Sequence, residues 1–313
     1  MNLPIQTNSQ IGTFAACNRR HWWAYELAIR PESRGVALSV GTAYHAAMEQ
    51  INTGHEPTPP TIEEPYATIV ACMIAGWRWR WANQPIGKVI AAERVFQFKP
   101  SRARFLQSGK IDSIQELPDG RLAVVETKTT GDDITPQSDY WRRLNIDRQI
   151  SIYMLGARAM GFPVETVIYD VARKPGMRPY AATPVESRKY RKDGGLYANQ
   201  REEDEPLTDF AARFMADIGE RHEWYFGRQE IPRLESDLEQ CRAELAMYAA
   251  DIRRARKGNA WPRNTDSCMR WGRCPYFGPC TNGHDPVTQG LPPGYRVAEN
   301  VNEELEIDDA QTE

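Results

Sequence analysis

The stretch GKIDSIQELPDGRLAVVETK, residues 109–128, decides the fold of this 313-residue chain. It contains two β-rich runs, 109–117 and 121–129, on either side of Pro118-Asp119-Gly120. A short Pro/Gly segment between two such runs is a strong signal for a tight turn that joins antiparallel strands. The sequence therefore predicts a β-hairpin at this point.

Two carboxylates and an ammonium group meet on the predicted hairpin. If three residues form the turn, Asp112 lies opposite Glu126 with the Cβ atoms about 5 Å apart, and Lys128 projects from the same face as Glu126. Two carboxylates this close repel unless a cation lies between them, and their oxygens suit Mg²⁺ or Mn²⁺. A neighbouring lysine can orient water or stabilise charge on a phosphate. The alternative is an exposed salt-bridge cluster, but the apolar residues 122–125 favour a buried strand.

The segments around the hairpin extend it to an α/β fold. Helical spacing covers residues 41–51, 66–83, 144–160, 207–224 and 234–257, and further strand patterns cover residues 88–98 and 165–171. This order predicts a mixed central sheet flanked by helices and followed by a helical C-terminal region. We divide the chain into an N-terminal segment (1–35), a core (36–205), a helical and cysteine-rich region (206–290) and an acidic tail (291–313) that we expect to be disordered.

The net charge of −3 conceals an acidic tail and a mildly basic body. Residues 299–313 contain seven acidic and no basic residues, and without them the chain carries a formal charge of about +4. Basic residues gather in the runs Arg78–Arg80, Arg142–Arg148, Arg188–Lys192 and Arg253–Lys257. Such runs are usually solvated faces, so alone they do not identify a nucleic-acid partner.

Aromatic and basic residues lie together in two places, residues 19–23 and 77–81. Arg19, Arg20, Trp22 and Trp23 suit single-strand binding through base stacking and phosphate neutralisation. For residues 77–81 core packing of the tryptophans is the favoured interpretation.

Four cysteines have a spacing typical of a metal site. Cys268, Cys274 and Cys280 lie on a Gly/Pro-rich segment, and Cys17 can complete the set. By ligand count the site could hold zinc or a [4Fe–4S] cluster. The other two cysteines, Cys72 and Cys241, lie in helical patterns and are expected to be ordinary buried thiols.

The hairpin motif, Gly109 to Asp112 followed by Glu126-Thr-Lys128, resembles the PD-(D/E)XK nuclease superfamily and specifically its RecB-type branch. The run Gly41-Thr-Ala-Tyr-His45-Ala-Ala-Met-Glu49 is similar to the histidine motif of that branch. Gln149-Ile-Ser-Ile-Tyr153 resembles its glutamine–tyrosine motif, and Glu93 resembles a glutamate before the first core strand. Each motif is weak alone, and their order carries the resemblance.

The resemblance implies a restriction-endonuclease-like core and metal-dependent cleavage of DNA. In that case Mg²⁺ or Mn²⁺ is held by His45, Asp112, Glu126 and the carbonyl of Thr127. Lys128 positions or activates water, and Gln149 and Tyr153 orient the site or contact DNA.

The same resemblance extends to the cysteines. One cysteine before the core and three after it are similar to the iron–sulfur staple of AddB-like members, which implies a [4Fe–4S] cluster on Cys17, Cys268, Cys274 and Cys280. Those families usually separate the first two of the trio by two residues, whereas here five residues separate Cys268 from Cys274. Cys268 is therefore the ligand that departs from the pattern.

The chain contains no G-x-x-x-x-G-K-[ST] loop, so we expect no helicase motor. We expect a stand-alone, phage-type exonuclease acting on single-stranded DNA or DNA ends in recombination, repair or replication, with a protein partner from these processes. No run approaches the roughly 20 apolar residues of a membrane span, and no signal peptide is evident, so we expect it in the bacterial cytosol. The alternatives are a non-catalytic nucleic-acid-binding subunit stapled by iron–sulfur or zinc, and a structural zinc protein.

Overall fold

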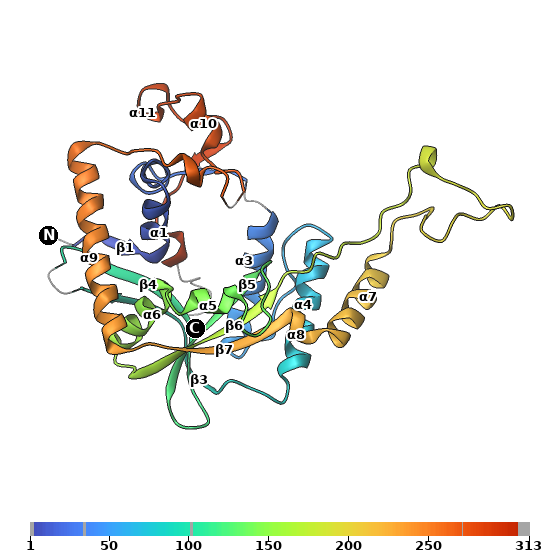
Figure 1. The fold of residues 1–313 in the computed structure, drawn as a ribbon, viewed down its shortest axis with the longest axis horizontal. Coiled ribbons are helices and arrows are strands. Elements are labelled where there is room, and N and C mark those ends of the chain that lie inside the picture. The colour runs from blue at the N-terminus through green and yellow to red at the C-terminus, as the bar shows by residue number, and fades with distance from the viewer. Residues whose placement is uncertain (1–2, 34–35, 101–102, 271, 306–313) are drawn as a thin grey trace.

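A mixed six-stranded sheet forms the centre of the protein (Figure 1). The structure is a computed structural model that describes residues 3–33, 36–100, 103–270 and 272–305. The strand order is β1-β4-β5-β6-β7, and β3 pairs with β4. The strands are β1 (Ile5–Thr7), β3 (Lys88–Phe98), β4 (Leu106–Glu116), β5 (Leu122–Thr130), β6 (Val164–Arg173) and β7 (Phe226–Pro232). The predicted α/β fold with a mixed sheet is confirmed.

Helices flank this sheet. The longer ones are α3 (Val36–Asn52), α4 (Tyr66–Trp81), α6 (Arg148–Ala159), α7 (Leu207–Glu220) and α9 (Glu235–Gly258). The shorter ones are α1 (Asn8–Ala16), α2 (Asn18–His21), α5 (Asp139–Leu144), α8 (His222–Tyr225), α10 (Phe277–Thr281) and α11 (Pro286–Gln289). Both α3 and α6 contact β3, β4 and β5, and α6 also contacts α9. These two helices can therefore bring side chains to the same strands.

The β4–β5 hairpin has the predicted register. Its pairs run from Glu116–Leu122 to Ser113–Val125, and the backbone N–H of Leu117 donates to the carbonyl of Arg121 at 2.8 Å. Gly120 has a φ of +86°, a conformation that glycine adopts without a steric penalty. The three-residue turn is therefore confirmed.

Strand β4 changes partners along one of its edges. β3 pairs with β4 along nearly its whole length, while the other edge pairs in parallel with β1 over residues 106–108 and with β5 over residues 113–116. Residues 109–112 pair with neither β1 nor β5. The ladder therefore stops at Asp112, where polar side chains can enter between the strands.

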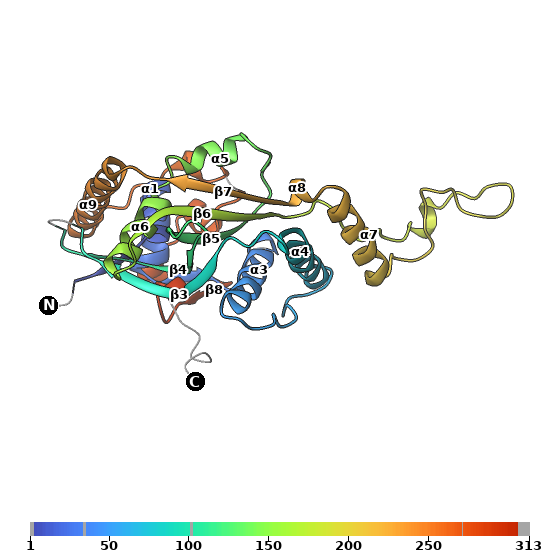
Figure 2. The same cartoon turned by 90° about the horizontal axis from the view of Figure 1, so that it is seen from below.

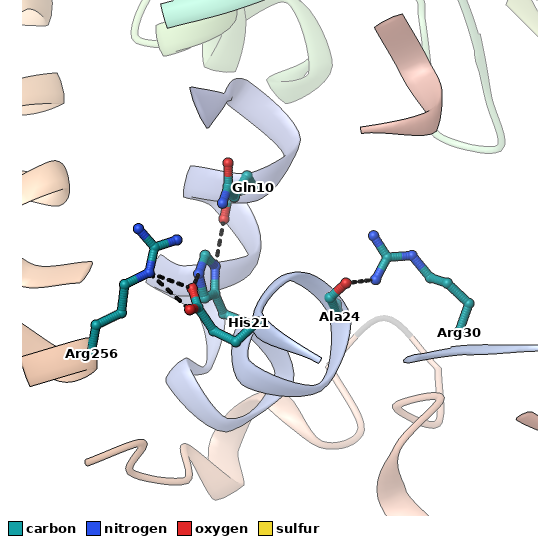
Figure 3. Close-up of polar contacts among 6 residues, drawn as sticks. Gln10, His21, Ala24, Arg30 and Arg256 are labelled. Carbon is teal, nitrogen blue, oxygen red and sulfur yellow. Dashed lines mark hydrogen bonds and ion pairs between the residues drawn. The ribbon is translucent and has the colours of Figure 1, made fainter. Parts of the chain in front are cut away.

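The two ends of the chain pack together. Strands β2 (Ile29–Pro31) and β8 (Tyr295–Val297) form a separate antiparallel pair, and a core cluster joins Trp23 to Trp261. The imidazole of buried His21 lies 3.2 Å from the carbonyl oxygen of Gln10 and 3.2 Å from the carboxylate of Glu26; Figure 3 shows the contact between His21 and Gln10. Arg256 of α9 donates to the same carboxylate at 2.8 Å. These polar contacts fix the N-terminal helices against α9.

A long connection between β6 and α7 extends away from the rest of the molecule (Figures 1 and 2). It carries the basic run Arg188–Lys192, and a bridge between Tyr190 and Leu196 closes its outer part. At its base the guanidinium of Arg213 on α7 donates to Glu205 at 2.6 Å. Within the described residues, no helix is long and apolar enough to span a membrane.

Several boundaries differ from the sequence predictions. Helix α3 begins at Val36, before the predicted start at residue 41. The predicted helix 144–160 is interrupted, because the Asp147 side chain accepts a hydrogen bond from the N–H of Gln149 and starts α6 there. Strands β1, β2, β7 and β8 were not predicted; β8 contradicts a wholly disordered tail over 291–313, of which residues 306–313 lie outside the described part.

Candidate active site

Asp112 lies where β4 and β5 part. Its Oδ2 atom accepts a hydrogen bond of 2.8 Å from the backbone N–H of Thr127. The side chain of Asp112 thus bonds to β5 at a point where the backbone pairing between β4 and β5 has ended. The Asp112 side chain remains 18% exposed. The neighbouring strand thereby holds one carboxylate at the surface of the site.

Glu126 is the buried member of the pair, with an exposed fraction of 1%. Its Oε1 atom contacts the ammonium of Lys128 and accepts a hydrogen bond of 3.1 Å from Gln149. Its Oε2 atom is buried and has no hydrogen-bond partner in the described structure. Burial, together with the charge of Asp112, raises the pKa of Glu126 to about 8 against the opposing effect of Lys128. A bare carboxylate oxygen in such a position is costly unless a cation or proton binds it.

Lys128 keeps its proton in this arrangement. Burial by itself would lower its pKa, but the charges of Glu126 and Asp112 raise the pKa above its ordinary value. The Lys128 side chain is still 30% exposed. The lysine is therefore suited to stabilising a neighbouring negative charge rather than to accepting a proton as a general base.

Gln149 and Tyr153 support Glu126 from α6. The Gln149 amide donates to Glu126 and also to the Tyr153 hydroxyl, at 2.7 Å in the latter case. Burial raises the pKa of Tyr153 well above its usual value, and its ring packs edge-on against Phe96 at 6.0 Å between centroids. This pair thus fixes the orientation of the buried carboxylate, as the i, i+4 spacing predicts.

His45 approaches from α3. Its Nδ1 atom lies 4.0 Å from Asp112 Oδ2, and the side chain is 36% exposed. Burial lowers the pKa of His45, and the charges of Lys128 and Lys110 lower it further against Asp112. One turn earlier, a Cβ atom on Gly41 would lie 3.1 Å from Thr129 Oγ1, so glycine permits this close approach to β5. The imidazole is neutral near pH 7, the form that binds metals.

A second charged cluster adjoins this group; the sequence motifs include its two glutamates, Glu49 and Glu93, but not its lysine, Lys110. The ammonium of Lys110 lies 2.8 Å from Glu93 and 3.8 Å from Glu49. Glu93 has a φ of +51°, and burial raises its pKa to about 7 against the effect of Lys110. A small cavity of about 90 Å³ is lined by Glu93, Lys110, Asp112, Thr127, His45, Met48, Glu49 and Asn52. The alternation along β4, with Lys110 two residues before Asp112, is the signal that could have revealed the lysine.

The cysteines predicted as cluster ligands lie at one end of the protein. Cys17 Sγ accepts a hydrogen bond of 3.4 Å from the N–H of Asn264, and the backbone of Cys274 bonds that of Cys268 at 2.8 Å. Burial raises the pKa of Cys274, and the nearby thiols of Cys280 and Cys17 raise it further. The fold therefore brings residue 17 to the C-terminal trio.

Neither group is assembled as a metal centre in its present side-chain arrangement. Among the described residues, no three His, Cys, Asp or Glu side chains are grouped closely enough to hold an ion. At the carboxylate site Lys128 occupies one oxygen of Glu126. Cys72 and Cys241 are buried in other core clusters, as expected of ordinary thiols.

The tryptophans serve mainly as core residues. Trp22 and Trp23 are buried, with 9% and 1% exposed, so the expectation that they stack on bases is wrong. In the second run, the Trp77 indole donates to buried Asp170 at 2.9 Å, and Trp81 lies under the guanidinium of Arg228. The packing interpretation of residues 77–81 therefore holds for these two side chains, but it is wrong for Trp79, which is 54% exposed.

Two solved structures and a family model are similar to this chain. A candidate exonuclease from Eubacterium rectale has 13% identity and a TM-score of 0.47, with 86% of this chain and 88% of that chain covered. A phage-related exonuclease from Haemophilus somnus has 11% identity and a TM-score of 0.30, with 75% and 94% covered. None of the curated proteins compared with the chain matches it. The family model of the PD-(D/E)XK nuclease superfamily matches residues 7–281, most of the chain, and the protein therefore belongs to this superfamily.

Proposed function

We propose that the protein is a metal-dependent DNA exonuclease of the RecB-type branch. The observation that carries the proposal is the Glu126 carboxylate, which is buried beside Asp112 with one oxygen lacking any hydrogen-bond partner in the described structure. Carboxylate oxygens of this kind are the ligands that Mg²⁺ and Mn²⁺ prefer. Membership of a nuclease superfamily supports hydrolysis of phosphodiester bonds as the reaction.

The donor set fits such an ion in its chemistry. Asp112, Glu126, neutral His45 and the carbonyl of Thr127 would hold the metal, which when bound activates water and neutralises phosphate charge. The Oε2 atom of Glu126, unpaired within the described residues, is available to the ion while Oε1 keeps its contacts with Lys128 and Gln149. A shift of the other donors toward this atom would complete the group, since the described side chains do not form a three-ligand group on their own.

The remaining side chains have separate tasks in this proposal. The Lys128 ammonium, which lies beside Glu126, neutralises charge that develops on the phosphate. Gln149 holds one oxygen of Glu126, and Tyr153 holds Gln149. The Thr127 N–H holds Asp112. Each of these contacts limits the rotation of a ligand and so favours one geometry of the site.

We further propose a [4Fe–4S] cluster on Cys17, Cys268, Cys274 and Cys280. The proximity of the four residues supports this, and so do the cationic surroundings. Burial raises the pKa of Cys280, but the charges of Arg263 and Arg19 oppose that rise, and the charge of Arg20 opposes the rise for Cys274. Guanidinium groups favour the thiolates that a cluster requires. The cluster would tie both ends of the chain together.

The proposed setting is recombination, repair or replication in the cytosol of a bacterium or phage-infected host. There the enzyme acts on single-stranded DNA or DNA ends beside a partner protein. The test is digestion of end-labelled single- and double-stranded DNA with Mg²⁺ or Mn²⁺ by wild type, by Lys128→Ala and by the control variant Arg242→Ala. DNA binding by each protein is measured separately, so that a loss of cleavage can be distinguished from a loss of binding. Stepwise shortening by wild type and Arg242→Ala, but not by Lys128→Ala, is expected. Near-normal turnover by Lys128→Ala contradicts the proposed site, and internal cuts without shortening contradict an exonuclease.

A further inference from the structure

A larger cavity lies beside the candidate active site. It has a volume of about 570 Å³ and lies beyond the ends of β5 and β6, between them and helices α3 and α4. Its charged lining residues are Arg173, Lys174 and Arg178, and no acidic residue of the described chain lines it. A volume of this size matches typical sites for small organic ligands. We propose that this basic cavity binds one unpaired nucleotide of a DNA strand next to the scissile phosphate.

The position of the basic cavity follows from two elements that it shares with the active site. Val40 lines the cavity and precedes His45 by five residues on α3, about 7.5 Å along a helix. Gly131 lines it and follows Lys128 by three residues, about 10 Å along an extended chain. Both lengths are short enough for the nucleotide that adjoins the scissile phosphate of an extended, unstacked strand to span them. A strand whose phosphate lies at Lys128 can therefore reach the cavity.

The basic residues of the cavity are held in place for an anion. The Arg173 guanidinium stacks on Trp224 at 4.0 Å from the ring centroid, and its Nε atom is buried with no hydrogen-bond partner in the described residues. Its ion pair with Asp133, at 3.6 Å, is long. The backbone N–H of Lys174 donates to the carbonyl of Thr130 at 2.7 Å and fixes the strand ends together. These contacts hold a positively charged guanidinium at this side of the cavity, where it can attract a phosphate.

The opposite wall is apolar, which distinguishes a nucleotide from a phosphate alone. Val40 and Ile69 are buried beneath the surface of the cavity, with 5% and 1% exposed, and the half-buried ring of Tyr66 lies beside them. The exposed guanidinium of Arg178 lies over Tyr66 at 5.7 Å. A base can stack on such a ring only if it is unpaired, because duplex bases are already stacked on one another. The inference deepens the proposed function by naming single-stranded DNA as the substrate class.

The test is binding of fluorescein-labelled oligothymidylate, measured by anisotropy without divalent metal, against a duplex of equal length. Arg178→Ala should weaken single-strand binding about fivefold and lower the slope of log affinity against log salt by about 1. Arg242→Ala, which alters a partly exposed arginine on α9 that does not line the cavity, is the matched control. Equal effects of the two arginine variants, or equal losses on duplex and single strand, would overturn the inference.

An abasic scan isolates the base-binding wall. For wild type, one abasic position in the oligonucleotide should lower the affinity about tenfold. Tyr66→Ala should bind intact DNA about tenfold more weakly than wild type does, and the abasic position should not lower the affinity of this variant further. Tyr66→Phe should retain the discrimination. A scan without a sensitive position contradicts the inference even if the enzyme digests DNA. A wild-type protein that neither binds nor digests any DNA contradicts the proposed function as well.

Discussion

Replacing Glu126 with glutamine should make the metal-free protein more stable and, at the same time, inactive. Glu126 is 1% exposed, and burial raises its pKa from 4.5 to about 8. The folded protein therefore binds a proton that the unfolded chain has lost at neutral pH. One pKa unit corresponds to about 1.4 kcal/mol, so at pH 7 this linkage costs about 3 kcal/mol of stability. Glutamine has the same shape without the charge and avoids this cost.

The sign of the pH dependence follows from the raised pKa. The cost is absent below the unfolded value of 4.5, grows as the pH rises and reaches its full size above about 8. E126Q should therefore melt about 5 °C above wild type at pH 7, and the difference should vanish near pH 4.5. Added Mn²⁺ should stabilise wild type but not the variant, since only wild type has both carboxylates.

The assay is thermal unfolding of the two proteins across this pH range, with Glu230→Gln as the matched control. Glu230 is exposed and pairs with Arg121, whose hydrogen bonds lower the pKa of Glu230. The Glu230 carboxylate therefore stabilises the fold above its unfolded pKa, and this stabilisation is lost as the pH falls. Glu230→Gln should accordingly lower the stability at neutral pH, whereas E126Q should raise it. An E126Q protein that is no more stable than wild type at pH 7, or a difference that does not change with pH, would refute the reasoning.

Three further outcomes follow from the same contacts. Mn²⁺ affinity, measured by calorimetry, should rise about tenfold per unit between about pH 6 and 8 and then level off, because one proton must leave Glu126; a flat profile contradicts this. Gln149→Ala should lower kcat about tenfold with little change in KM, since the amide holds Glu126; a change in KM alone would instead make Gln149 a DNA contact. Cys280→Ser should remove bound iron and lower the melting temperature, whereas Cys241→Ser, in a buried site away from the trio, should retain both; equal iron contents would exclude the proposed cluster.

The local parts of the fold could be predicted from the sequence. Turn chemistry and β-rich runs predicted the β4–β5 register correctly, because both are properties of adjacent residues. The short strands β1 and β2 could not be predicted, since three residues carry too little pattern. β7 was missed for another reason. Its sequence, Phe-Gly-Arg-Gln-Glu-Ile-Pro, is polar in the middle, as is common for a strand at a sheet edge.

The residues of the candidate site could be predicted from the sequence, but their pKa shifts could not. Motif order selected Asp112, Glu126, Lys128 and Gln149, which the fold gathers around one interruption of the sheet. The interruption itself depends on β1 pairing with β4, a contact between distant segments. The raised pKa of Lys128 could not be inferred from spacing either. It follows from the charges of Glu126 and Asp112, which outweigh the effect of the lysine's own burial.

The claim that a divalent ion binds between two strand carboxylates can be measured directly. Mn²⁺ titrated into metal-free protein at pH 8, followed by electron paramagnetic resonance, reports the number of bound ions. The account predicts a site in wild type that is lost in both Asp112→Asn and Glu126→Gln and retained in Glu230→Gln. Unchanged Mn²⁺ binding in the first two variants would contradict it.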